Sequence, residues 1–192
     1  LNGAGSSSIG AVTGATMVAQ AGAQVSFQGM SVGERPGESG TLTVSGVGTI
    51  WRDVGSTNPA GNGGYLSVGN GGTGYATITA GASVISTAGD TIGYQAGSYG
   101  ALTVNSGASV SDSSLSVGNL GTGYVTLAAA TITSTNGVQI GQGGQGTVDI
   151  GASGTLLFGG TFNPVGGNAG GNGLLRIQSG GVARATNPAS NA

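Results

Sequence analysis

The chain lacks cysteine, histidine and lysine, and it carries few charges of either sign. Without cysteine it forms neither a disulfide framework nor a thiolate metal site. Its four arginines are scattered along 192 residues, whereas nucleic-acid binding requires clustered cations. No run of about 18 apolar residues occurs, so we predict no membrane insertion as a helix. No signal-peptide pattern begins at Leu1, so we expect an exported chain to have lost its targeting segment.

Glycine is abundant, with 44 residues, and its placement is periodic. An apolar residue followed by glycine recurs along the chain, and successive anchor glycines are separated by 23, 36, 24, 25, 23 and 25 residues. The anchor glycines are Gly10, Gly33, Gly69, Gly93, Gly118, Gly141 and Gly166. A fixed period of this size is typical of a repeat architecture.

In each repeat a second glycine opens a run in which apolar and polar residues alternate. An aliphatic residue stands four positions after that glycine: Val18, Val44, Ile78, Val104, Leu127, Ile150 and Ile177. The intervening polar positions include the threonines Thr43, Thr77, Thr103 and Thr126. Alternation with period two predicts a strand that buries one face and turns the threonines outward.

Two further short strands are expected in each repeat. One ends at the anchor glycine, with inward candidates such as Leu66 and Val68. The other follows a small-residue turn, with inward candidates Val25, Ile50, Val84, Val110, Ile132, Leu156 and Val182. A single repeat cannot bury these residues, but stacked repeats can. The sequence therefore predicts an all-β protein, a single right-handed parallel β-helix over residues 1–192, with about seven coils of roughly 24 residues.

Three segments resemble a known repeat: YLSVGNGGTGYATITAGASVIS (Tyr65–Ser86), TIGYQAGSYGALTVNSGASVSD (Thr91–Asp112) and LSVGNLGTGYVTLAAATITS (Leu115–Ser134). They are similar to the short glycine-rich repeat shared by type V autotransporter passengers and PEP-CTERM-associated proteins. The resemblance implies a β-helical stalk that is extracellular or at the bacterial cell surface, and it implies no catalytic residues. The departures from the pattern are an insertion and the absence of the membrane barrel of autotransporters from these 192 residues. We therefore expect either that the barrel lies elsewhere in a longer parent chain or that this chain is not an autotransporter.

The insertion, at about residues 52–64, is the one break in the period. Insertions in repeat proteins form loops on one face, which is often the binding face. Trp51, Arg52 and Asp53 lie at its base and are our candidate binding loop. Trp51 could stack on a sugar or on a partner protein, and it could equally pack the loop onto the coil.

The aspartates are the residues to test for catalysis, because paired carboxylates cleave glycosidic bonds. Asp90 stands three residues before its anchor glycine and Asp112 stands six before its own, so no acid pair is expected to share a column. Aspartates at regular positions, which calcium-binding repeats require, are also missing. We therefore expect no enzyme activity, no catalytic residue, no cofactor and no metal site.

Self-association is predicted from the ends of the expected β-helix. Its terminal coils leave backbone groups unpaired, and lysine, which usually protects such edges, is absent. Candidate assembly residues are Leu1, Asn2, Pro188 and Asn191. The function expected is an extracellular structural or adhesive module, a surface stalk or a filament subunit, with a glycan or a host or cell surface as a further partner. The alternatives are a polysaccharide-acting β-helix enzyme and an ice-binding or glycan-binding solenoid suggested by the threonine column.

Overall fold

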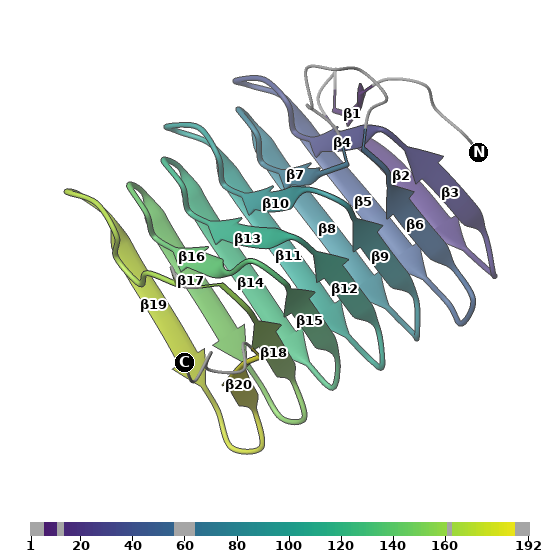
Figure 1. Ribbon diagram of the computed structural model, residues 1–192. Coiled ribbons are helices and arrows are strands. Elements are labelled where there is room, and N and C mark those ends of the chain that lie inside the picture. Colours follow the sequence, from purple (N-terminus) through teal and green to yellow (C-terminus); the bar gives the residue numbers. More distant parts are fainter. Residues whose placement is uncertain (1–5, 11–13, 56–63, 161–162, 187–192) are drawn as a thin grey trace.

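The computed structural model describes residues 6–10, 14–55, 64–160 and 163–186. These residues contain twenty β-strands and no helix. The strands form three parallel sheets, and successive repeats stack as a β-solenoid of about seven turns (Figure 1). The prediction of an all-β parallel β-helix is therefore confirmed.

Each sheet takes every third strand of the chain. Sheet 1 contains β1 (Ser6–Ile9), β4 (Gly29–Val32), β7 (Leu66–Val68), β10 (Gly89–Ile92), β13 (Ser114–Val117) and β16 (Val138–Ile140). Sheet 2 contains β2 (Ala15–Gln20), β5 (Ser39–Ser45), β8 (Thr73–Thr79), β11 (Tyr99–Asn105), β14 (Thr122–Ala128), β17 (Gln145–Ile150) and β19 (Asn172–Ile177). Sheet 3 contains β3 (Gln24–Phe27), β6 (Ile50–Asp53), β9 (Ser83–Ser86), β12 (Ser109–Asp112), β15 (Thr131–Ser134), β18 (Thr155–Phe158) and β20 (Val182–Ala185).

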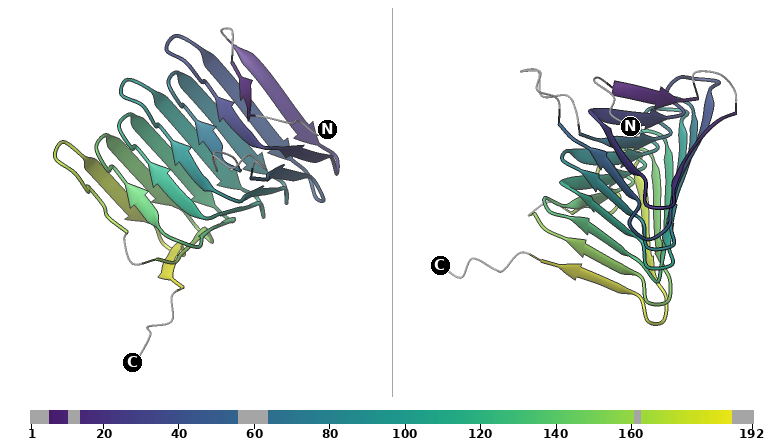
Figure 2. Two further views of the ribbon diagram at one scale, coloured as in Figure 1. Left: turned by 45° about the horizontal axis from the view of Figure 1, so that its top comes forward. Right: turned by 90° about the vertical axis from the view of Figure 1, so that its right-hand side faces the viewer.

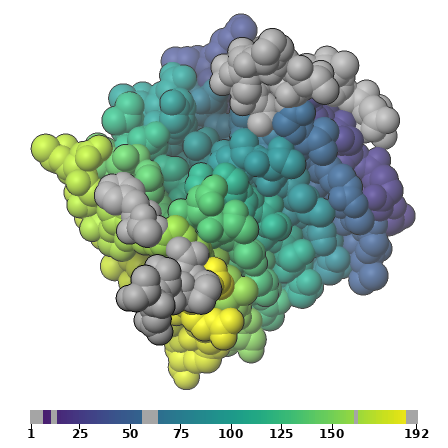
Figure 3. All heavy atoms as spheres, viewed as in Figure 1, coloured from purple at the N-terminus to yellow at the C-terminus, as the bar shows by residue number. Residues whose placement is uncertain are grey.

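One coil passes through sheets 1, 2 and 3 in that order before the next coil begins. Figures 1 and 2 show the strands of sheet 2 folding back through short turns into those of sheet 3. Strands β1, β2 and β3 lie at one end of the stack, and β19 and β20 lie at the other. In the space-filling view the colours succeed one another along the stack, as expected when each coil packs on its neighbours (Figure 3).

Inward side chains at matching positions of successive strands form columns through the interior. The column predicted first is confirmed: its members Val44, Ile78, Val104, Leu127 and Ile150 are all fully buried and lie on adjacent strands of sheet 2. Thr77, Thr103 and Thr126 pair side by side on the opposite face and are not buried. The pleat, which sends alternate residues to opposite faces, therefore separates core from surface as the sequence indicates.

The prediction is wrong for the first strand of sheet 2. Ala15, rather than Gly14, pairs with Gly40, which places Ala19 in the column of Val44. Val18 consequently points outward and is 53% exposed. A shift of one residue moves every side chain of a strand to the other face, so aligning the repeat on Gly14 inverted the strand.

Two positions in sheet 3 require the same correction. Trp51 rather than Ile50 pairs with the inward Val84, and Ala183 rather than Val182 pairs with the inward Leu156. Trp51 is fully buried, whereas Val182 is exposed. In both coils the turn before sheet 3 shifts the inward position by one residue from the position that we expected.

The insertion falls at the corner between sheets 3 and 1. Strand β6 continues to Asp53, so Arg52 and Asp53 belong to the strand and not to the loop. Most of the remaining insertion, residues 56–63, lies outside the described residues. After it, Leu66 pairs with Met30, so the solenoid resumes with the same register.

Candidate functional site

The three residues predicted to form a binding loop do not form a surface site. Trp51 and Asp53 face the interior, where each has no exposed surface, while Arg52 between them faces outward. The Trp51 ring packs 5.1 Å from the ring of Phe27, centroid to centroid. Its indole N–H donates a hydrogen bond of 2.9 Å to Asp53 Oδ2. The interpretation of Trp51 as a packing residue is the one that this geometry supports.

A cluster of buried carboxyl groups lies inside the solenoid near the corner between sheets 3 and 1, and we call Asp53, Asp90 and Asp112 the carboxyl cluster. Their exposed fractions are 0%, 1% and 3%. The expectation that no two acids share a column is wrong, because Asp53 and Asp112 occupy one column of sheet 3. From the β3 end of the stack to the β18 end, that column contains Phe27, Asp53, Ser86, Asp112, Ser134 and Phe158.

Asp90 reaches the cluster from sheet 1, where it occupies a position that is aliphatic in the adjacent coils. It pairs with Leu115 on one side, and on the other side the backbone N–H of Leu66 donates a hydrogen bond of 2.8 Å to Asp90 Oδ1. Asp90 Oδ2, Asp53 Oδ1 and both carboxyl oxygens of Asp112 have no hydrogen-bond partner among the described residues. Polar atoms buried without partners are costly, so these oxygens destabilise the interior when the groups are ionised.

Burial is the main cause of a raised pKa in all three groups. It raises the pKa of Asp53 from 3.8 to about 7, although the hydrogen bond from Trp51 acts in the opposite direction and lowers the pKa. Burial, and then the nearby Asp112 carboxyl, raise the pKa of Asp90 well above its usual 3.8. Burial also raises the pKa of Asp112 to about 7. The nearby hydroxyl groups of Ser86 and Ser134 offset part of the rise in the pKa of Asp90 and of Asp112, respectively. Neither hydroxyl group makes a hydrogen bond in the structure.

The carboxyl cluster has the protonation chemistry of a general acid but no access for a substrate. A carboxyl group that holds its proton near pH 7 suits general acid catalysis. The side chains face the interior, however, and are at most 3% exposed. Within the part of the chain that the structure describes, no group of three or more acidic, histidine or cysteine residues is placed to hold a metal ion. Burial of these groups therefore links their protonation to the stability of the solenoid.

The sequence contained a signal for this cluster. In sheet 3, Val84, Val110 and Ile132 each precede a polar inward residue by two positions, namely Ser86, Asp112 and Ser134. Alternation counted from these aliphatic residues places Asp112 inside. Counting from the anchor glycine hides the pattern, because the corner between sheets 3 and 1 varies in length from coil to coil.

The outer face of sheet 2 carries an array of three tyrosines, Tyr75, Tyr99 and Tyr124. The ring centroids are 5.8 Å apart for Tyr75 and Tyr99, and 5.7 Å apart for Tyr99 and Tyr124. Burial, followed by the influence of the two neighbouring phenols, raises the pKa of Tyr99. The three side chains therefore form one continuous aromatic strip across three coils, which the sequence repeat did not indicate.

The end of the stack formed by β19 and β20 is open. Beyond these strands no further strand pairs with them among the described residues. The inward column of Ile150 ends at Ile177, which is 49% exposed, whereas Ile150 itself has no exposed surface. In contrast, the inward residue Phe27 at the opposite end is only 6% exposed.

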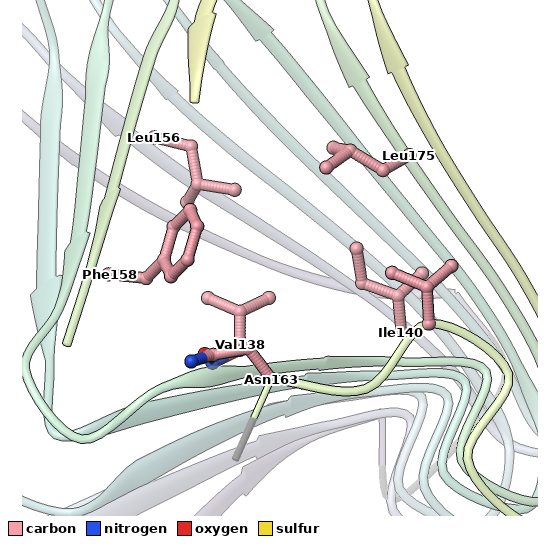
Figure 4. Close-up of a pocket in the computed structure, with 7 residues that line it drawn as sticks. Val138, Ile140, Leu156, Phe158, Asn163 and Leu175 are labelled. Carbon is pink, nitrogen blue, oxygen red and sulfur yellow. Dashed lines mark hydrogen bonds between the residues drawn. The ribbon is translucent and has the colours of Figure 1, made fainter. Parts of the chain in front are cut away.

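Side chains from all three sheets converge at this open end (Figure 4). They line an apolar recess of about 80 Å³ and comprise Val138, Ile140, Leu156, Phe158, Asn163, Val165 and Leu175. Asn163 closes one edge, because its Oδ1 accepts a hydrogen bond of 2.7 Å from the N–H of Val138. The recess is much smaller than the roughly 300–1,000 Å³ of ordinary ligand pockets, so it suits packing against another coil better than binding a small molecule.

The predicted assembly residues Leu1, Asn2, Pro188 and Asn191 lie outside the described residues. The described residues also include no helix that is long and apolar enough to cross a membrane. Comparison of the chain with protein-family models, with curated proteins and with solved structures finds no match.

Proposed function

We propose that this chain is a structural module, a β-solenoid stalk or filament subunit located outside the cell or at the bacterial cell surface, which lengthens by end-to-end stacking. The observation that carries the proposal is the open end at β19 and β20, where Ile177 leaves an apolar column half-exposed. The resemblance of the repeat to autotransporter passengers supports the location. The proposal assigns no catalytic residue, cofactor or metal to the chain.

The occupant proposed for the open end is the β1–β3 end of a second copy. In that arrangement β2 of the second copy adds to sheet 2 beside β19, and β3 adds to sheet 3 beside β20. Edge strands present unpaired N–H and C=O groups that template such pairing. A head-to-tail contact does not close on itself, so repeated addition produces a filament.

A charge placed at the open end tests the proposal. Ile177→Lys should place an ammonium group where the next coil has to pack, and should abolish assembly. Val47→Lys is the matched control, because Val47 is 85% exposed on a turn between sheets 2 and 3, in the second coil rather than in either terminal coil. Light scattering after gel filtration at several concentrations, together with negative-stain electron microscopy, measures the assembly of each variant.

The unsubstituted chain and Val47→Lys should form rods whose mass grows with concentration, while Ile177→Lys stays monomeric. A chain that is monomeric at every concentration would overturn the filament form of the proposal. An enzyme is the competing class. Release of reducing sugar from a polysaccharide, lost on Asp112→Asn, would overturn the assignment as a structural module.

A further inference from the structure

The tyrosine array lies on a part of sheet 2 whose outward residues carry no charge. Its members belong to the three neighbouring strands β8, β11 and β14, and Tyr75 and Tyr124 are 47% and 40% exposed. The outward residues of these three strands are Thr73, Tyr75, Thr77, Thr79, Tyr99, Ala101, Thr103, Asn105, Thr122, Tyr124, Thr126 and Ala128. On sheet 2, charge first appears on β17 and β19, where Asp149 and Arg176 pair at 3.3 Å.

A column of hydroxyl groups runs beside the aromatic strip. Thr77, Thr103 and Thr126 pair in register on the same three strands, two residues beyond the positions of Tyr75, Ala101 and Tyr124. Two parallel rows therefore follow the axis of the solenoid, one aromatic and one hydroxylated. Coils repeat at about 4.8 Å, so both rows offer contacts at short, regular intervals.

This surface is held rigidly. Strands β8, β11 and β14 each pair with a strand on both sides, and their inward residues Ile78, Val104 and Leu127 are fully buried. A rigid site loses little conformational entropy when a ligand binds. Tyrosine adds a large contact area with few rotatable bonds and a phenol group that can hydrogen-bond.

We propose that the outer face of sheet 2 binds a neutral, extended polysaccharide that lies along the solenoid axis. The C–H faces of sugar rings match the aromatic strip, and sugar hydroxyls match the threonine column. A polyanion, including nucleic acid, is disfavoured because the outward residues of β8, β11 and β14 include no cation, and Arg176 on β19 is paired with Asp149. The assignment concerns a lateral face, so it is independent of stacking at the open end.

The test uses cellohexaose and maltohexaose as neutral probes and polygalacturonate as the charged probe. Binding is measured by calorimetry and by perturbation of tyrosine resonances in NMR spectra. Tyr124→Ala should weaken binding of a neutral hexasaccharide roughly tenfold or more, whereas Tyr124→Phe, which keeps the ring, should retain most of the affinity. Tyr94→Ala is the matched control, because Tyr94 is 41% exposed but lies in the turn after β10.

Circular dichroism of each variant verifies that the solenoid remains folded. The inference is overturned if neither hexasaccharide binds with a Kd below roughly 1 mM. It is equally overturned if polygalacturonate binds as tightly as the neutral probes, or if Tyr124→Ala and Tyr94→Ala have equal effects. If Tyr124→Ala instead abolishes a lateral association of two copies, the face is a protein interface and the polysaccharide assignment fails. Ile177→Lys should leave saccharide binding unchanged, which separates this result from the stacking experiment.

Discussion

The anchor glycines and the strand-opening glycines meet at the corner between sheets 1 and 2. Gly93 has a φ of +73°, and a Cβ at this position would overlap the backbone carbonyl oxygen of Thr122 in the next coil. A Cβ on Gly100 would likewise overlap the backbone carbonyl oxygen of Val68 in the preceding coil. Neighbouring backbones approach too closely here for any side chain, so the glycine period records the stacking of coils as well as the turns within them.

Gly93→Ala should destabilise the protein by about 3–5 kcal/mol, since the left-handed backbone and the clash with Thr122 each add to the cost. Gly97 is the matched control. It has a φ of +79°, but nothing lies within 4 Å of the position of its missing Cβ. Gly97→Ala should therefore cost only about 1–2 kcal/mol, and urea unfolding measures both. Equal losses would show that conformation, and not close approach, selects the anchor glycines.

Asp112→Leu should stabilise the protein by about 1–4 kcal/mol at pH 8, because it replaces a buried carboxylate whose oxygens have no partner by an apolar group of similar size. At pH 4, where the carboxyl is neutral, the gain should shrink. Asp53→Leu is the comparison variant and should gain less, since it removes the acceptor of the Trp51 indole N–H. Unfolding by urea at both pH values provides the measurement, and a loss of stability at pH 8 would contradict the account of Asp112.

At the scale of the strand, alternation decides which residues matter. Val104 is fully buried in β11, whereas its neighbour Thr103 faces outward and is partly exposed. Val104→Asp should cost more than about 4 kcal/mol at pH 8, because it places an unpaired charge in an apolar column. Thr103→Asp should change the free energy of unfolding by less than about 1 kcal/mol. Similar effects in thermal unfolding would contradict the assigned faces of sheet 2.

The strand scale also explains why the interior accepts three aspartates. Each stands in the last column of sheet 3 or the neighbouring column of sheet 1, near the corner, and not in the aliphatic columns of sheet 2. There the indole of Trp51 and the N–H of Leu66 each supply a hydrogen bond. A strip of polar side chains therefore runs along this corner of the interior, beside the aliphatic columns.

For the molecule as a whole, the carboxyl cluster predicts stability that falls as pH rises. The pKa of Asp53 and of Asp112 is 3.8 in an unfolded chain and about 7 in the folded protein. Between these values the folded state binds more protons than the unfolded state, so the stability present below about pH 4 is lost as pH rises through 7. The raised pKa values should together lower the stability by several kcal/mol between these limits.

Chemical unfolding from pH 4 to pH 9 measures this dependence. The triple variant Asp53→Asn, Asp90→Asn and Asp112→Asn should flatten the profile, because its interior no longer titrates. Thr103→Val, on the outer face of sheet 2, removes no titratable group and should leave the pH profile unchanged. Stability that stays constant or increases between pH 5 and pH 8 would rule out protonated carboxyl groups in the folded core.

The sequence alone determined the solenoid and most of its interior. A single repeat of short strands cannot bury its apolar residues, whereas stacked repeats can. The recurring glycines and the aliphatic column from Val44 to Ile150 therefore indicated a solenoid. The alternation of apolar and polar residues can be read within each strand, and each coil places equivalent residues next to those of its neighbour. Sequence reasoning succeeded wherever the residue spacing was constant.

Only the tertiary structure decided what happens where that spacing changes. In β2, β6 and β20 the inward positions differ by one residue from those that we expected, so Trp51 is buried and Val18 is exposed. The corner between sheets 3 and 1 brings Asp90 near Asp112, although they occupy different positions in the repeat. Corner geometry depends on how coils pack on one another, so it determines which side chains meet across sheets, and the periodic sequence carries little information about it.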